Sequence, residues 1–139
     1  MSDHVQLIYC SRPFGFTEAA LDEILEVSRR RNRRDGITGS LVCRHDLYLQ
    51  LLEGTDDAVT GAFERISRDD RHADIRKLWH GRAVGRLFPG WDMRHDPVRP
   101  WMWTSDDIAG GALERAGPLK LVAFFARVAS EPHELGKFN

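Results

Sequence analysis

The amino-acid sequence predicts an α+β fold: a ferredoxin-like βαββαββ sheet with two helices on one face, followed by two C-terminal helices. Three observations support this prediction. Four apolar runs have the length and punctuation of strands, at residues 5–10, 37–44, 47–53 and 75–84. Two intervening stretches, residues 17–32 and a segment from residue 56, place apolar side chains at helical spacing. The order of these segments is that of a split βαβ sheet.

Capping and turn residues mark the boundaries of these segments. Thr17 is the expected N-cap of the first helix, and Gly36 turns the chain after it. A tight turn at residues 45–46 joins the second and third strands as a hairpin. Residues 54–56 start the second helix, whose inward stripe is Val59, Ala62, Phe63 and Ile66. After a Phe-Pro-Gly turn, residues 91–94 are expected to form a short fifth strand.

The character of the chain changes near residue 96, which predicts a domain at residues 1–96 and an extension at residues 97–139. The extension begins with an extended linker rich in proline and tryptophan. Two helices follow, at residues 106–116 and 118–130. The second of these is apolar on most sides, so we expect it to pack on the free face of the sheet or against another subunit.

Composition places the chain among ordinary globular domains. Of 139 residues, 42% are hydrophobic and 29% charged, with a net charge of -1, which argues against a general nucleic-acid or membrane binder. Cys10 and Cys43 form no CxxC pair and are expected to be free thiols in a reducing compartment. No secretory signal and no membrane-spanning run is evident, so a cytoplasmic location is expected. Histidine and cysteine show no metal-site spacing.

Gln50 lies in the middle of the most apolar strand. Strand side chains alternate between faces, so Gln50 shares a face with Tyr48, and both faces are predicted to be buried. A buried amide left unpaired costs about 1–3 kcal/mol. Either the neighbouring backbone satisfies it, or a partner does. The candidate partners are Tyr9 and the end of the first helix around Ser28 and Asn32.

The inward face of the first helix changes from apolar to polar along its length. Two apolar turns are followed, at the same spacing, by Ser28 and Asn32. Taken alone, this change is equally compatible with a fraying helix end and with the polar wall of a pocket. Together with Gln50 and Tyr9, it favours a polar pocket between the two helices, above the sheet.

Five arginines lie near the end of this helix, within residues 29–34. Such a run is usually a solvated face that complements the negative end of a helix. It can also hold a phosphate or diphosphate at a pocket mouth. The second helix also ends in polar residues, and Asp69 lies three residues beyond the inward Ile66. An aromatic heterocycle with a polar edge and a phosphorylated tail suits this arrangement.

Six separated motifs, in order and within about residues 4–95, resemble the BLUF domain, the family of blue-light sensors that use flavin. The motifs are Tyr9 in its apolar strand, Ser28 with Asn32, residues 36–39, Gln50 in residues 49–54, Asp69 with Arg71 and His72, and residues 88–93.

The resemblance implies a non-covalently bound flavin, usually FAD, with FMN or riboflavin as alternatives. Asn32 is implied to hold the polar edge of the ring, and Gln50 to lie between Tyr9 and the flavin. The other implied flavin contacts are Ile24, Ser28, Arg31, Tyr48, Asp69, Arg71 and His72.

The resemblance also implies a mechanism, in which light drives electron and proton transfer between tyrosine and flavin and the glutamine then changes its hydrogen bonds. Trp91 and Met93 are expected on one face of the fifth strand, where they compete for the site beside Gln50 and relay the signal. The relay is expected to reach an unidentified protein partner or a homo-oligomer, with no enzymatic activity in the chain itself.

Two alternatives belong to other functional classes. A flavin-dependent oxidoreductase needs an open substrate site beside the flavin, and no nicotinamide-binding glycine pattern is found. A ferredoxin-like RNA-binding module is suggested by the arginine run. The strand at residues 47–52 lacks the basic and aromatic pattern of such modules, so no nucleic-acid partner is expected.

Overall fold

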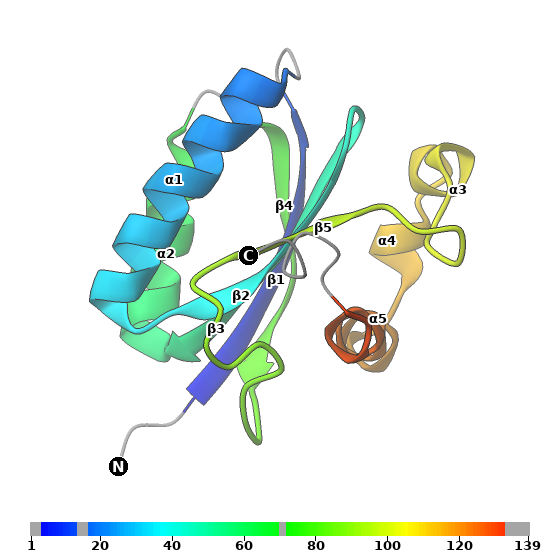
Figure 1. The fold of residues 1–139 in the computed structure, drawn as a ribbon. Helices are drawn as coiled ribbons and strands as arrows, with labels where there is room; N and C mark the ends of the chain where they lie inside the picture. Colours follow the sequence, from blue (N-terminus) through cyan, green and yellow to red (C-terminus); the bar gives the residue numbers. More distant parts are fainter. Residues whose placement is uncertain (1–3, 14–16, 70–71, 133–139) are drawn as a thin grey trace.

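The computed structural model describes residues 4–13, 17–69 and 72–132. Its centre is a five-stranded sheet in the order β4-β1-β3-β2-β5 (Figure 1). The strands are β1 (His4–Pro13), β2 (Thr38–Arg44), β3 (Leu47–Thr55), β4 (His72–Arg82) and β5 (Arg94–Pro97). The first four strands pair antiparallel, and β5 adds to β2 in parallel.

The strand register brings the two central polar side chains together. β1 and β3 pair so that Tyr9 lies directly opposite Gln50. Because the side chains of residues directly opposite each other in paired strands lie on the same face, both project to the same side of the sheet. Tyr9 and Gln50 are 0% and 3% exposed, which confirms the prediction that this position is buried.

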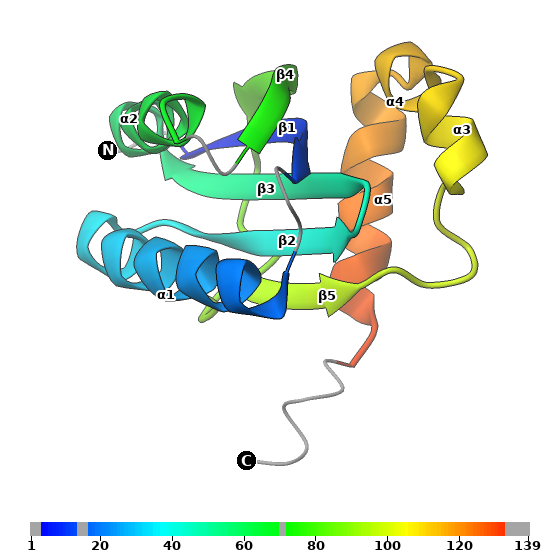
Figure 2. The ribbon, with the colours of Figure 1, turned by 90° about the horizontal axis from the view of Figure 1, so that it is seen from above.

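Two helices cover that side of the sheet, as the sequence predicts (Figure 2). Helix α1 (Glu18–Asp35) is capped by the Thr17 side chain and ends at Gly36, whose φ of 71° is a left-handed conformation that suits glycine. Helix α2 (Asp56–Ser67) is capped by Thr55. Apolar side chains of both helices and of the sheet form a buried cluster, here called the pocket-side cluster, that includes Leu7, Leu21, Ile24, Leu52, Val59 and Met93.

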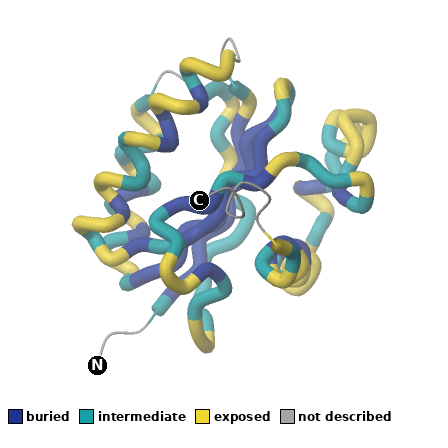
Figure 3. Tube along the Cα trace, viewed as in Figure 1, coloured by how far each residue is buried: buried dark blue, intermediate teal, exposed yellow. Residues whose placement is uncertain are grey.

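The other face of the sheet is covered by the C-terminal segment (Figure 1). Up to residue 132, where the description ends, three helices follow β5: α3 (Ser105–Ala109), α4 (Ala112–Arg115) and α5 (Pro118–Ser130). A second buried cluster, here called the extension-side cluster, joins the sheet to these helices through Ile8, Val42, Leu49, Leu51, Phe88, Leu113, Leu121, Phe125 and Val128. The sheet is therefore buried on both faces, which is why its central strands are continuous apolar runs (Figure 3).

The fold class is confirmed, with three corrections to its elements. The fifth strand is Arg94–Pro97, not residues 91–94, because residues 88–93 form turns and bends before pairing with β2 begins. The helix expected at residues 106–116 is two short helices, because the chain turns at Gly111, where φ is +87°. Strand β1 ends at Pro13, later than the expected residue 10. Strand β4 begins at His72, earlier than the expected residue 75. No described helix is both long and apolar enough to cross a membrane.

Candidate functional site

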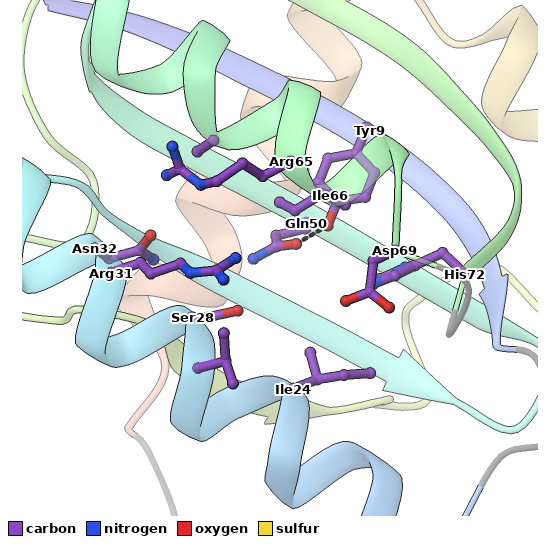
Figure 4. Close-up of a pocket in the computed structure, with 12 residues that line it drawn as sticks. Tyr9, Ile24, Ser28, Arg31, Asn32, Gln50, Arg65, Ile66, Asp69 and His72 are labelled. Atoms are coloured by element: carbon purple, nitrogen blue, oxygen red, sulfur yellow. Dashed lines mark hydrogen bonds between the residues drawn. The ribbon is translucent and has the colours of Figure 1, made fainter.

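A polar cleft lies between α1, α2 and the pocket side of the sheet (Figure 4). Each helix contributes residues at i, i+3, i+4 and i+7, the spacing of a single helical face. From α1 these are Ile24, Val27, Ser28 and Arg31. From α2 and the residues that follow it they are Ala62, Arg65, Ile66 and Asp69. Asn32, Tyr9, Gln50 and His72 complete the lining.

Tyr9, Gln50 and Met93 form a continuous line of hydrogen bonds at the floor of this cleft. The Tyr9 hydroxyl donates to Gln50 Oε1 in a short contact. Gln50 Nε2 donates to the thioether sulfur Met93 Sδ at 3.2 Å. The bond to oxygen satisfies the acceptor of the buried amide, whereas thioether sulfur is a weak acceptor. The amide is therefore held firmly at its oxygen and loosely at its nitrogen.

The electrostatics of Tyr9 keep its hydroxyl protonated. Complete burial raises the pKa of the phenol well above its ordinary value, and the negative charge of Asp69 raises it further. Phe63 packs edge-on against the ring, with 5.4 Å between centroids. The hydroxyl therefore donates a hydrogen bond, and the Gln50 oxygen accepts it.

The end of α1 holds the segment that carries Met93. Asn32 Nδ2 donates to the Asp92 carbonyl at 2.7 Å, and Arg29 Nε donates to the Met93 carbonyl at 3.0 Å. Arg33 Nε pairs with the Asp92 carboxylate at 2.9 Å. Together, these three contacts fix the position of Met93 relative to the helix that lines the cleft.

At the other end of the cleft, His72 connects the site to β1. A ring nitrogen, Nδ1, lies 2.8 Å from Ser11 Oγ. The imidazole ring also packs against two aromatic rings, with centroids 6.4 Å from Tyr9 and 5.1 Å from Tyr48. Tyr48 is 1% exposed and is not part of the cleft lining.

The structure brings most of the residues singled out in the sequence to one place. Ile24, Ser28, Arg31, Asn32, Gln50, Asp69, His72 and Tyr9 all line the cleft. Tyr48 does not line it. Arg71 lies outside the described residues.

Trp91 and Met93 do not share a face, contrary to expectation. Met93 is 1% exposed in the pocket-side cluster, whereas Trp91 packs against the extension-side cluster. There the Trp91 ring lies 5.7 Å from the guanidinium carbon of Arg94. The expectation assumed strand alternation, but these residues precede β5, and a chain in turns and bends need not place residues i and i+2 on one side.

Four lining residues were not predicted as site residues: Val27 and Arg65 were not singled out, and Ala62 and Ile66 were assigned only to the inward stripe of the second helix. Val27 is three residues after Ile24, and Arg65 is three after Ala62, so the helical spacing that found their neighbours includes them. Val27 and Arg65 are half-buried and lie beside the positions predicted to face the sheet. The cleft instead follows the half-buried edge of each helix, where Arg65 also pairs with Asp35 at 3.1 Å.

Comparison with known proteins identifies the family. The model of the family described as "Sensors of blue-light using FAD" matches residues 4–94. The chain is 35% identical over 96 residues to photoactivated adenylate cyclase subunit beta of Euglena longa, covering 67% of this chain and 11% of that protein. It is 32% identical over 68 residues to the blue light- and temperature-regulated antirepressor BluF of Escherichia coli K12, covering 49% of this chain and 17% of that protein.

Solved structures agree with these sequence matches. BlrB, a BLUF protein in its dark state, is 30% identical with a TM-score of 0.75, covering 94% of this chain and 98% of that chain. Photo-activated BlsA has a TM-score of 0.77 at 23% identity, with 94% and 97% covered, which supports the fold. The chain spans about a tenth of the length of the cyclase relatives, so the match concerns a small part of those proteins. The chain belongs to the BLUF family of blue-light sensors.

Proposed function

We propose that the cleft between α1 and α2 binds a flavin, preferentially FAD, and that Tyr9 and Gln50 carry its light response. The observation that carries this proposal is the line of hydrogen bonds from Tyr9 through Gln50 to Met93 at the floor of the cleft. Bound flavin would supply absorption of blue light and an acceptor for one electron.

The donors and apolar groups of the cleft fit a flavin. Ile24, Val27, Ala62 and Ile66 offer apolar surface to a planar ring. Asn32 and Gln50 offer amides to its polar edge, and Arg31, which makes no hydrogen bond or ion pair with the described residues, offers a free cation to phosphate.

The size of the cleft requires side-chain movement to admit the ring. Its cavity is about 40 Å³, below the roughly 300–1,000 Å³ typical of ligand sites. The exposed Arg31 side chain extends across the space between Ser28 and Gln50 (Figure 4). Because an exposed arginine changes rotamer freely, we expect Arg31 to swing outward and pair with the flavin phosphates.

The response to light follows from the unequal bonds of Gln50. Tyr9 can release its proton to Gln50 Oε1 as it gives up an electron, since the two atoms are already hydrogen-bonded. An amide offers both a donor and an acceptor, so rotation or tautomerism exchanges what Gln50 presents to the ring. The weak bond from Nε2 to Met93 is lost at little cost, which makes Met93 the group released by the switch.

We further propose that the signal leaves the cleft through Met93 and Arg94. Arg94 follows Met93 directly and is 5% exposed on the other face of the sheet. Its guanidinium donates to Asp96 Oδ1 at 3.0 Å and to the Glu131 carbonyl, just beyond α5, at 2.5 Å. Movement at Met93 is therefore transmitted to the end of α5. In this scheme residues 1–96 are the sensor and residues 97–139 the responding extension, which acts on a partner protein or on a second copy.

A reducing, cytoplasmic location completes the proposal, supported by two buried cysteines that are free thiols. A flavin-dependent oxidoreductase and an RNA-binding module are distinguished from a sensor by spectroscopy. A sensor is yellow and shows a reversible red shift on illumination. An oxidoreductase is bleached by its reductant, and an RNA-binding module is colourless.

The direct test uses purified protein with flavin, whose absorption is recorded before and after blue light. Gln50→Leu and Tyr9→Phe should both retain flavin, because neither removes a helix residue of the cleft, and both should lose the light-induced red shift. The control is Arg30→Gln, at an exposed position outside the lining, which should keep the shift. A normal shift in Gln50→Leu would refute the proposed mechanism.

A further inference from the structure

An ion pair joins the two helices that form the walls of the cleft. Asp35 is the last residue of α1, and it continues the helical spacing of Ser28 and Arg31, which line the cleft from that helix. Arg65 lies on the opposite wall, formed by α2 (Figure 4). Arg65 Nη2 donates to Asp35 Oδ2 at 3.1 Å, and this pair is here called the clasp.

The clasp differs in kind from the other groups that face each other across the cleft. Those groups include Ile24 and Val27 on α1 and Ile66 on α2, which are apolar and can part without breaking a directional bond. The clasp is charged and hydrogen-bonded, so separating the two walls at this end means breaking it.

Asp35 is held in position to accept from Arg65. Arg34 Nε and Nη2 donate to the two oxygens of Asp35 at 2.9 and 3.1 Å. These bonds, and then the positive charges of Arg34 and Arg65, hold the pKa of Asp35 below its ordinary value, so it is ionised at neutral pH. A carboxylate in the last turn of a helix opposes the helix dipole, so the stability of α1 does not depend on Asp35.

The clasp is exposed enough to open and to form again. The Asp35 and Arg65 side chains are 21% and 34% exposed, so water and salt reach both groups. The cavity of about 40 Å³ must widen severalfold to admit a ligand of flavin size, and outward movement of Arg31 leaves the clasp in place between the two walls.

We propose that the Asp35–Arg65 clasp is a gate that must open for a flavin to enter or leave the cleft, and that it closes again behind the bound flavin. The inference rests on the proposed flavin binding and adds the control of exchange. Because the clasp is present both before and after binding, it slows entry and release alike and has little effect on affinity.

The test measures exchange of riboflavin in the dark by stopped-flow flavin fluorescence. Riboflavin is used because it is uncharged, so a change in protein charge does not attract or repel it. Asp35→Asn should raise the association and dissociation rates alike, by about two- to fivefold, and change the dissociation constant less than about twofold. In the Arg65→Met background, Asp35→Asn should change neither rate further, because the clasp is already absent.

A salt series tests the clasp without any substitution. At about 1 M salt the screening length is about 3 Å, so exchange in the parent should approach the rates of Asp35→Asn, whose own rates should stay constant. The matched control is Glu114→Gln, which removes a carboxylate from an exposed ion pair with Arg76, outside the cleft lining, and should exchange as the parent does.

Equal exchange rates in the parent and Asp35→Asn would overturn the proposal. So would faster dissociation without faster association, since Asp35 would then support binding and not control entry. A parent that binds riboflavin, FMN or FAD with rates that respond neither to Asp35→Asn nor to salt refutes the clasp alone. A parent that binds none of the three refutes the proposed function and the clasp with it.

Discussion

Arg94 offers the sharpest test of how the sheet is joined to α5. Its guanidinium donates to Asp96 Oδ1 and to the Glu131 carbonyl, and it lies over the rings of Phe88 and Trp91. Asp96 is 0% exposed and has two other partners, the Ser40 hydroxyl at 2.9 Å and the Arg99 guanidinium at 3.7 Å. Arg94→Met retains much of the apolar stem and leaves the buried Asp96 charge with the Ser40 hydroxyl and the longer contact to Arg99.

The expected cost is large because a buried charge loses its partner. Removing one member of a buried ion pair costs about 3–5 kcal/mol when the other charge is left unpaired. Because Arg99 remains beside Asp96, the free energy of unfolding of Arg94→Met should fall by up to that amount. Asp96→Asn keeps the size of the side chain and the contact with Ser40 but removes the negative charge. The double variant contains neither buried charge, so we expect it to be more stable than additivity predicts, by about 1–3 kcal/mol.

The assay is urea denaturation of the parent, both single variants and the double variant, followed by circular dichroism. Arg33→Met is the matched control, because the Arg33 side chain is 76% exposed and forms a surface ion pair, worth about 0–1 kcal/mol. If the stability loss of the double variant equals the sum of the two single losses within about 0.5 kcal/mol, Arg94 and Asp96 are not coupled. Unchanged stability in Arg94→Met would refute the larger claim that this residue joins β5 to α5.

Two further predictions concern the buried groups on either face of the sheet. Met93→Leu conserves the side-chain volume but removes the sulfur that accepts a hydrogen bond from Gln50. The free energy of unfolding should change by less than about 1.5 kcal/mol, whereas the rate of dark recovery should change. An unaltered recovery rate would exclude Met93 from the switch. Burial raises the pKa of Cys10 and Cys43 from 9.0 to about 11, so their stabilising contribution is complete below pH 9 and is lost as pH rises towards 11. Unfolding midpoints measured across this range should fall in the parent and fall less in the double serine variant, and parallel curves would contradict the assignment.

The sequence by itself determined the main elements and the centre of the site. Alternation within the strands places both Tyr9 and Gln50 on buried faces. Helical spacing likewise identifies Ile24, Ser28 and Asn32 as one wall of the cleft. These properties are periodic and local, so a residue's position within its own element is enough to predict them.

Only the tertiary structure decided the side to which Met93 and Trp91 turn. Both lie in a segment without regular structure, where no period relates neighbouring side chains and contacts with α1 fix the backbone. The same holds for Arg94, whose two carbonyl partners at the end of α5 are 34 and 37 residues away. Such contacts depend on how separate elements pack together. Packing is determined by the whole chain at once, which is why local patterns could not reveal them.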